Sequence, residues 1–149
     1  MAEINRKELI LALVGAGTTP RLAGIDLSAL DMTRLDMTGA SARAAKFVAA
    51  TLREAILINA NLSFSDMTTV QGVGLDLNGA NLTGVNFSSA TLTSARLTNA
   101  NLTNAILNGA NLTGANMKGA IVTGLKFNES TTWPDGKKGS QGNPVSYTT

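Results

Sequence analysis

Apolar and polar residues recur along this chain with a strict period of five, seen most clearly from Leu75 to Phe127. The third place of each five holds Leu, Phe, Met or Val, and the first place is most often Ala. Asn, Thr, Ser and Gly fill most of the other three places. Because neither an amphipathic helix nor a half-buried strand repeats every five residues, the pattern predicts a solenoid of short stacked segments.

The same phase continues upstream without a slip, so the repeat block runs from Ile25 to Glu129 as 21 uninterrupted fives. Residues 1–24 precede this block and residues 130–149 follow it. One five, VQGVG, has Gly72 at the place where a core side chain is expected. Either the coil is thin at this point or a neighbouring side chain fills the space.

The triplet Ala-Asn-Leu opens the fives that begin at Ala60, Ala80, Ala100 and Ala110. In these residues the chain resembles the pentapeptide-repeat family, and the resemblance covers the whole repeat block. It implies an all-β fold, a right-handed quadrilateral parallel β-helix with one five on each side and four sides in each coil. The family is functionally diverse, so this resemblance does not by itself indicate a role.

Four fives in each coil place residues 20 apart above one another. One inward column then contains Phe47, Phe87 and Phe127, together with Leu and Met residues. We interpret this column as a packed core of stacked rings and aliphatic side chains rather than as a ligand channel.

The segment before the repeats predicts a short capping helix from Asn5 to Val14, with Asn5 as N-cap and Glu8 three residues later. Such a helix would cover the exposed strand edges at the open end of a solenoid. The rival interpretation is a signal peptide over residues 1–17, with two basic residues, an apolar run and then small residues. We favour the helix and a cytoplasmic protein; a cleaved segment would indicate a secreted or periplasmic one. Whether the N-terminus is processed stays open.

At the other end, Trp133-Pro134-Asp135-Gly136 has the residues of a turn. We expect Trp133 to cover the apolar mouth of the last coil. The polar residues that follow predict a flexible tail. With both ends capped, the chain is expected to be a monomer.

Composition removes most kinds of chemistry. The chain has no Cys and no His, so thiolate nucleophiles, imidazole bases and the usual zinc ligands are absent. The repeat block has seven acidic and seven basic residues, and this neutral balance does not favour nucleic acid or anionic lipid as partner. No apolar run approaches the ~20 residues that span a bilayer. We expect no catalytic activity, no cofactor and no metal.

One coil offers a candidate contact site for an unidentified partner protein. Ile56 and Ile58 flank an inward Leu and so point outward, on a face that is otherwise polar. The bases Arg43, Lys46 and Arg53 lie close to them in the sequence, and the aromatic residue among them, Phe47, belongs to the inward column. The predicted function is therefore a non-catalytic structural or protein-interaction rod. The alternatives are a topoisomerase-protecting protein that mimics DNA, and a secreted effector or surface protein.

Overall fold

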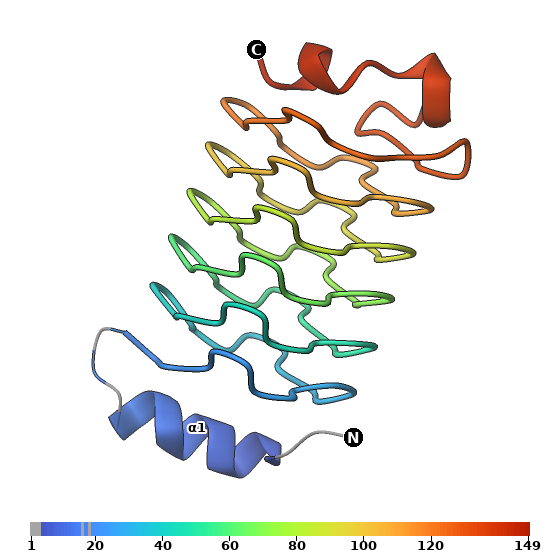
Figure 1. Cartoon of the computed structure of the whole chain (residues 1–149). Helices are drawn as coiled ribbons and strands as arrows, with labels where there is room; N and C mark the ends of the chain where they lie inside the picture. The colour runs from blue at the N-terminus through green and yellow to red at the C-terminus, as the bar shows by residue number, and fades with distance from the viewer. Residues whose placement is uncertain (1–3, 16, 18) are drawn as a thin grey trace.

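The computed structural model describes residues 4–15, 17 and 19–149, in which the chain winds into a right-handed, four-sided β-helix (Figure 1). Parallel bridges join residues 20 apart along the rod, from Arg21 and Ser41 to Ile106 and Lys126. Each coil therefore has 20 residues and four ladders. We name the four sides after the paired residues of one coil: the Ser41, Lys46, Thr51 and Ile56 sides.

Backbone hydrogen bonds in two directions hold each coil to its neighbours. The third residue of a five donates to the coil above, as the Leu82 N–H does to the Asn101 carbonyl at 2.8 Å. The second residue donates to the coil below, as the Asn81 N–H does to the Ala60 carbonyl at 2.9 Å. The paired segments are too short to form long strands, and each side contributes a single bridge residue per coil.

Asp and Asn are common in the second place of a five because their side chains accept a backbone hydrogen bond there. The fourth N–H of each five has no backbone acceptor of this regular kind, and the second side chain can supply one. The Asn81 Oδ1 atom accepts from the Thr83 N–H at 3.1 Å, and Asp66 accepts from Thr68 at 3.0 Å. Because buried or half-buried amides require partners, Asp or Asn completes the backbone of its own five.

The corners of the rod all use left-handed backbone. Every non-glycine residue with positive φ among the described residues occupies the fifth place of its five, with φ between 53° and 60°. The turn closes when the first N–H of the next five donates to the third carbonyl, as Ala80 does to Leu77 at 3.0 Å. Positive φ at the third residue of such a turn favours Gly or Asn, and Gly is the most frequent residue in the fifth place.

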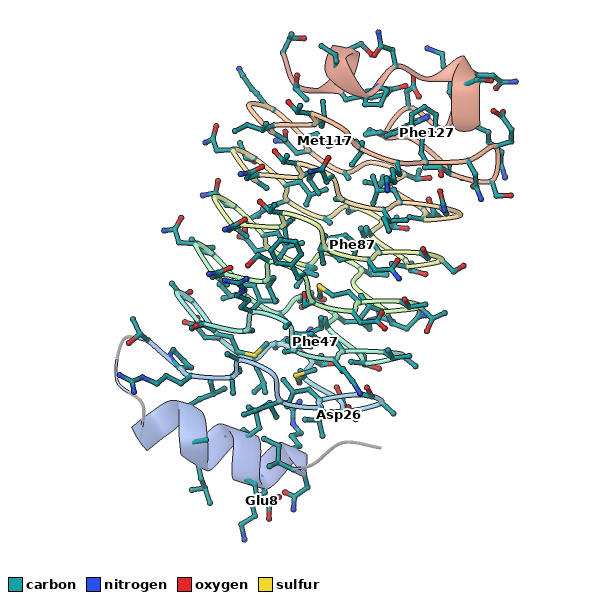
Figure 2. All side chains as sticks on the ribbon, in the orientation of Figure 1. Glu8, Asp26, Phe47, Phe87, Met117 and Phe127 are labelled. Atoms are coloured by element: carbon teal, nitrogen blue, oxygen red, sulfur yellow. The ribbon has the colours of Figure 1, made fainter. Side chains whose placement is uncertain are left out.

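The core consists of the first and third residues of each five. Phe47 and Phe87 are completely buried inside the rod, whereas Phe127 at its end is only partly buried (Figure 2). The predicted column is therefore a packed interior over the middle coils. Its last ring depends on the C-terminal segment for cover.

The gap expected at Gly72 is filled by its neighbours. A Cβ atom placed on Gly72 would lie 3.2 Å from methyl groups of both Leu75 and Leu92. The two leucines have moved into the space that a central side chain takes elsewhere. Of the two possibilities left open by the sequence, the second is the correct one.

Helix α1 (Arg6–Gly15) lies across the N-terminal end of the rod (Figure 1). The Asn5 side chain accepts from the Glu8 N–H at 3.0 Å, and the Glu8 carboxylate accepts from the Asn5 N–H at 2.8 Å. These reciprocal bonds confirm the predicted capping box. Leu9 is fully buried. The signal-peptide alternative includes residues 1–3 and 16, which lie outside the described residues.

Pairing begins one five earlier than the sequence period, because the first bridge already includes Arg21. The PRLAG five was overlooked because Arg and Pro replace its usual polar and small residues, although its central Leu22 is buried. Arg6 of α1 covers part of the exposed edge below. Its guanidinium donates to the backbone carbonyls of Asp31 and Thr33, which have no coil beneath them.

Trp133 closes the C-terminal end from inside the bore. The ladder slips by one residue there, so that Asn111 pairs with Thr132 and Trp133 takes the inward place above Leu112. The indole is fully buried, and its Nε1–H donates to the Gly139 carbonyl at 2.8 Å. Its ring meets Phe127 edge to face, with 5.0 Å between centroids.

The residues after Trp133 fold over this end instead of forming the loose tail expected from their composition (Figure 1). Two short 3₁₀ helices form, η1 (Gly139–Gln141) and η2 (Pro144–Tyr147). The Tyr147 ring stacks on Trp133 with 5.7 Å between centroids. A polar segment can therefore be anchored here by one aromatic ring and by backbone hydrogen bonds, without an apolar cluster of its own.

Polar contacts fasten the same ring. The Tyr147 hydroxyl donates to Asp135 at 2.9 Å, and the Lys137 ammonium lies 2.8 Å from the same carboxylate. Hydrogen bonding from Lys137 lowers the pKa of Asp135 to about 2. Burial, followed by the bond to Asp135, raises the pKa of Tyr147 to about 12.

Candidate interaction site at an exposed corner

The structure does not gather the predicted contact residues on one surface. Ile56 and Ile58 lie on the Ile56 side, and Arg43, Lys46 and Arg53 lie on three other sides. The chain passes to the next side of the rod every five residues. Residues that are close in the sequence therefore lie on different sides of the rod. Two pairs flank a shared corner of the rod, Arg43 with Lys46 and Arg53 with Ile56.

The isoleucine pair is also less exposed than the sequence suggested. Ile56 and Ile58 are both half-buried by the outward side chains around them. Near Arg53, the Arg34 guanidinium donates to the Glu54 carboxylate at 2.7 Å and lowers the pKa of Glu54. The acidic and basic groups on that side therefore offset each other.

Phe64 was not among the site residues predicted from the sequence. It is unusual in the repeat block because it is a large apolar residue at an exposed corner. Its side chain is 58% exposed and its backbone is left-handed, with φ of 60°. An L-residue with a bulky side chain is disfavoured in this backbone conformation, and an exposed ring leaves apolar surface in water. Phe64 therefore combines a disfavoured backbone conformation with exposed apolar surface, which makes it a candidate functional residue.

The ring of Phe64 is held in place from two sides. The Arg43 Cζ atom lies 5.3 Å from the ring centroid, within the range of a cation–π contact. One coil above, a Cβ atom on Gly84 would lie 2.7 Å from the ring. The ring thus rests on bare backbone, and only glycine leaves room for it there.

The surface above Phe64 carries no formal charge. On the Ser41 side, the fives that begin at residues 60, 80, 100 and 120 contain no Asp, Glu, Lys or Arg. In the first three of these fives the Ser or Thr hydroxyl donates to the Asn side chain, as the Thr83 hydroxyl does to Asn81 at 2.7 Å. At the far end Ile121 is 50% exposed. We call Phe64, Arg43 and this uncharged strip the corner site.

A model of the pentapeptide repeats, eight copies in all, matches residues 36–70, 73–109 and 95–131 of this chain. These residues make up more than half of the sequence and coincide with the ladders described above. The chain belongs to the pentapeptide-repeat family. No curated protein matches it.

Several solved pentapeptide-repeat proteins are similar to this one. QnrB1, a plasmid-mediated fluoroquinolone resistance protein, is 22% identical over 74% of this chain and 59% of its own, with a TM-score of 0.46. HetL from Nostoc sp. strain PCC 7120, involved in heterocyst differentiation regulation, is 26% identical over 80% of this chain and 62% of its own, with a TM-score of 0.35. The chain therefore spans less than two thirds of either protein.

A third relative is a pentapeptide-repeat protein from the thylakoid lumen of Arabidopsis thaliana. It is 28% identical over 88% of this chain and 87% of its own, with a TM-score of 0.36. The family model identifies the repeat, and these structural likenesses do not extend to a role. The interpretation of the corner site rests on this chain's own residues.

Within the described part of this pentapeptide-repeat protein, no cluster of three or more carboxylates could hold a metal ion. None of the helices described there has the length and hydrophobicity of a bilayer-spanning segment. What the corner site does offer is a fixed aromatic ring, a guanidinium against it and a flat strip of satisfied polar groups. These features suit a contact with another macromolecule.

A sequence signal for the corner site did exist. Phe64 is the one aromatic residue in the fifth place of any five, where Gly, Asn, Ser and Ala predominate. Ala44 follows Arg43 in the chain, and Phe64 lies 20 residues after Ala44, directly above it in the next coil. The bases therefore do have an aromatic neighbour, which is hidden because it comes one coil later in the chain.

Proposed function

We propose that this pentapeptide-repeat protein is a non-catalytic interaction rod that recognises a partner protein through the corner site, with Phe64 as the anchor. The observation that carries the proposal is an exposed phenylalanine held in a left-handed backbone conformation. Folding alone would favour Gly or Asn at this corner. Retention of Phe64 is accounted for if its ring is buried in a complex.

The surroundings of Phe64 match those of residues that dominate protein interfaces. Aromatic and Arg side chains are enriched among such residues, especially where polar groups surround them. The Phe64 ring and the Arg43 guanidinium are already in contact, so little side-chain freedom is lost on binding. Arg43 and the exposed Lys46 favour a partner that offers an apolar pocket beside carboxylates.

A matched pair of variants tests this proposal. Phe64→Asn removes the anchor and places at the corner a residue that other corners of the rod already use. Val145→Asn removes an equally exposed apolar side chain, 59% exposed, from the C-terminal segment. Immobilised wild type and both variants are compared for capture of proteins from the native host, with each captured band quantified.

We expect a specific partner to be captured by the wild type and by Val145→Asn, and to be lost with Phe64→Asn. Arg43→Glu should weaken capture of the same partner. Equal capture by Phe64→Asn and the wild type would contradict the proposal. If capture instead fails with Ile56→Lys and Ile58→Lys together, the Ile56 side is the contact surface.

A further inference from the structure

Apolar residues surround helix α1 instead of lying along one stripe. Leu9 is fully buried against the rod, but Ile10 is 38% exposed and Leu11 is 62% exposed. A helix that is apolar on all sides is normally covered on all sides. The rod covers one face of α1, and its opposite face points away from the rod (Figure 1).

Three residues define this outer face. Lys7, Leu11 and Gly15 follow one another at intervals of four, so they lie on one side of the helix, nearly opposite Leu9. All three are exposed, and a Cβ atom on Gly15 would meet nothing within 4 Å. Leu11 is therefore an apolar centre, with a cation one turn before it and an open glycine one turn after it.

The exposed Lys7 is complementary to the C-terminal end of α1 in a reversed copy, whereas the neighbouring Glu8 carboxylate is bonded to the Asn5 N–H of its own chain. The last turn of the helix has no basic residue, so its C-terminal carbonyls have no compensating cation within the helix. The cation of this face, Lys7, is at the opposite end. Two copies in antiparallel orientation would bring Lys7 of each to the C-terminal end of the other.

We propose that the outer face of α1 is the contact between two copies of this chain, related by a two-fold axis that passes close to Leu11. Lys7 then lies beside Gly15 of the partner subunit, where the absence of a side chain lets its ammonium approach the helix carbonyls. The same patch serves both copies, as a two-fold interface requires. The contact is small, so the association is weak and depends on concentration.

This pairing joins two rods end to end and leaves the corner site of each exposed. It is independent of the proposed function, and either can fail without the other. It is an alternative to the expected monomer with capped ends, and that expectation stays untested. The cap itself presents an apolar outer face, which the sequence period could not show.

Cysteine cross-linking tests the pairing directly, because the natural chain contains no cysteine. Leu11→Cys places one thiol near the proposed axis. Val145→Cys places one at a site of similar exposure, 59% against 62%, at the other end of the rod. Under mild oxidation we expect a covalent dimer with Leu11→Cys at several times the yield seen with Val145→Cys. Equal yields, or a higher yield with Val145→Cys, would overturn the proposal.

Sedimentation of the cysteine-free chain supplies the second readout. The wild type should associate with rising concentration, and Leu11→Glu should remain monomeric with unchanged circular dichroism. Lys7→Glu should weaken association roughly fivefold or more, since it reverses a charge at each of two helix ends. A wild type that stays monomeric at millimolar concentration, or association that Lys7→Glu leaves unchanged, would refute the antiparallel contact.

Discussion

Two corners on the same side of the rod have the same backbone and different side chains. Phe64 and Asn104 are both left-handed, with φ of 60° and 56°, and each lies against a glycine one coil above. Asn104 lies beneath Gly124, and Phe64 lies beneath Gly84. Only the side chains differ, so the comparison separates what the fold requires from what it merely tolerates.

Asparagine fits this corner because its short polar side chain is compatible with left-handed backbone. Phenylalanine has no such advantage, and much of its ring faces water. Asn would therefore fit the backbone at either corner. Under the proposed function, recognition rather than folding accounts for the aromatic ring, and the following variants test that distinction.

The largest contrast is between Phe64 and a buried phenylalanine. Phe87→Ala should lower the free energy of unfolding by ~3–5 kcal/mol, because it opens a cavity in the middle of the bore. Phe64→Ala should lower it by no more than ~1 kcal/mol, the amount expected from an exposed cation–π contact. Urea denaturation measures both. Similar losses for the two variants would show that Phe64 is structural.

The glycine above each corner gives the next largest effect. Gly84→Ala should cost ~1–2 kcal/mol, since alanine is strained at a φ of +64° and its Cβ meets the Phe64 ring. In a Phe64→Ala background the part of this cost that comes from the contact with the ring disappears. The part that comes from backbone strain remains. A double-mutant cycle should therefore give a coupling of about 0.5 kcal/mol or more.

Gly124→Ala with Asn104→Ala is the matched cycle at the second corner. A Cβ atom on Gly124 would meet the Asn104 side chain in the same way. Zero coupling at Gly84 would mean that the ring does not rest on it.

Moving the ring tests the comparison in the opposite direction. Asn104→Phe should lower stability by about 1 kcal/mol, the strain of a bulky residue in left-handed backbone. It should not restore partner capture to Phe64→Asn, because Thr83 takes the place below Asn104 that Arg43 has below Phe64. Recovery of capture would show that any exposed ring on this side suffices.

The C-terminal cap should respond to pH, whereas the contact of Phe64 with Arg43 contains no carboxylate or phenol. The pKa of Asp135 is lowered from 3.8 to about 2, so its contribution is present above pH 3.8 and is lost as pH falls through 2. The pKa of Tyr147 is raised from 10.0 to about 12, so its contribution is present below pH 10 and is lost as pH rises through 12.

Fluorescence of Trp133, the one tryptophan, reports on the cap at both extremes. Asp135→Asn should remove the acid transition. An unchanged acid transition in that variant would assign it to another group.

Much of the fold could be predicted because the period of five indicates which residues face inward. The burial of Phe87 and the capping box of Asn5 and Glu8 follow from local spacing. The first five was overlooked because Arg21 departs from the pattern. The C-terminal cap required knowledge of a one-residue slip that brings Trp133 into the bore, and no local signal marks that slip.

The candidate site was harder to predict, because it brings together residues that are one coil apart in the chain. Arg43 and Phe64 are 21 residues apart in the chain and in contact in the rod. Ile56, by contrast, is close to Arg53 in sequence and lies on another side. In a solenoid the coil length decides which residues are neighbours. A surface patch must therefore be sought among residues about 20 positions apart in the sequence.

In the proposed function, Phe64 serves binding and not folding. The free energy of unfolding of Phe64→Asn, measured in urea beside the wild type, tests it most directly. We predict a value within ~1 kcal/mol of the wild type, since Asn relieves the backbone strain and replaces a largely exposed ring. A loss of ~3 kcal/mol or more, as expected for a buried phenylalanine, would contradict the account.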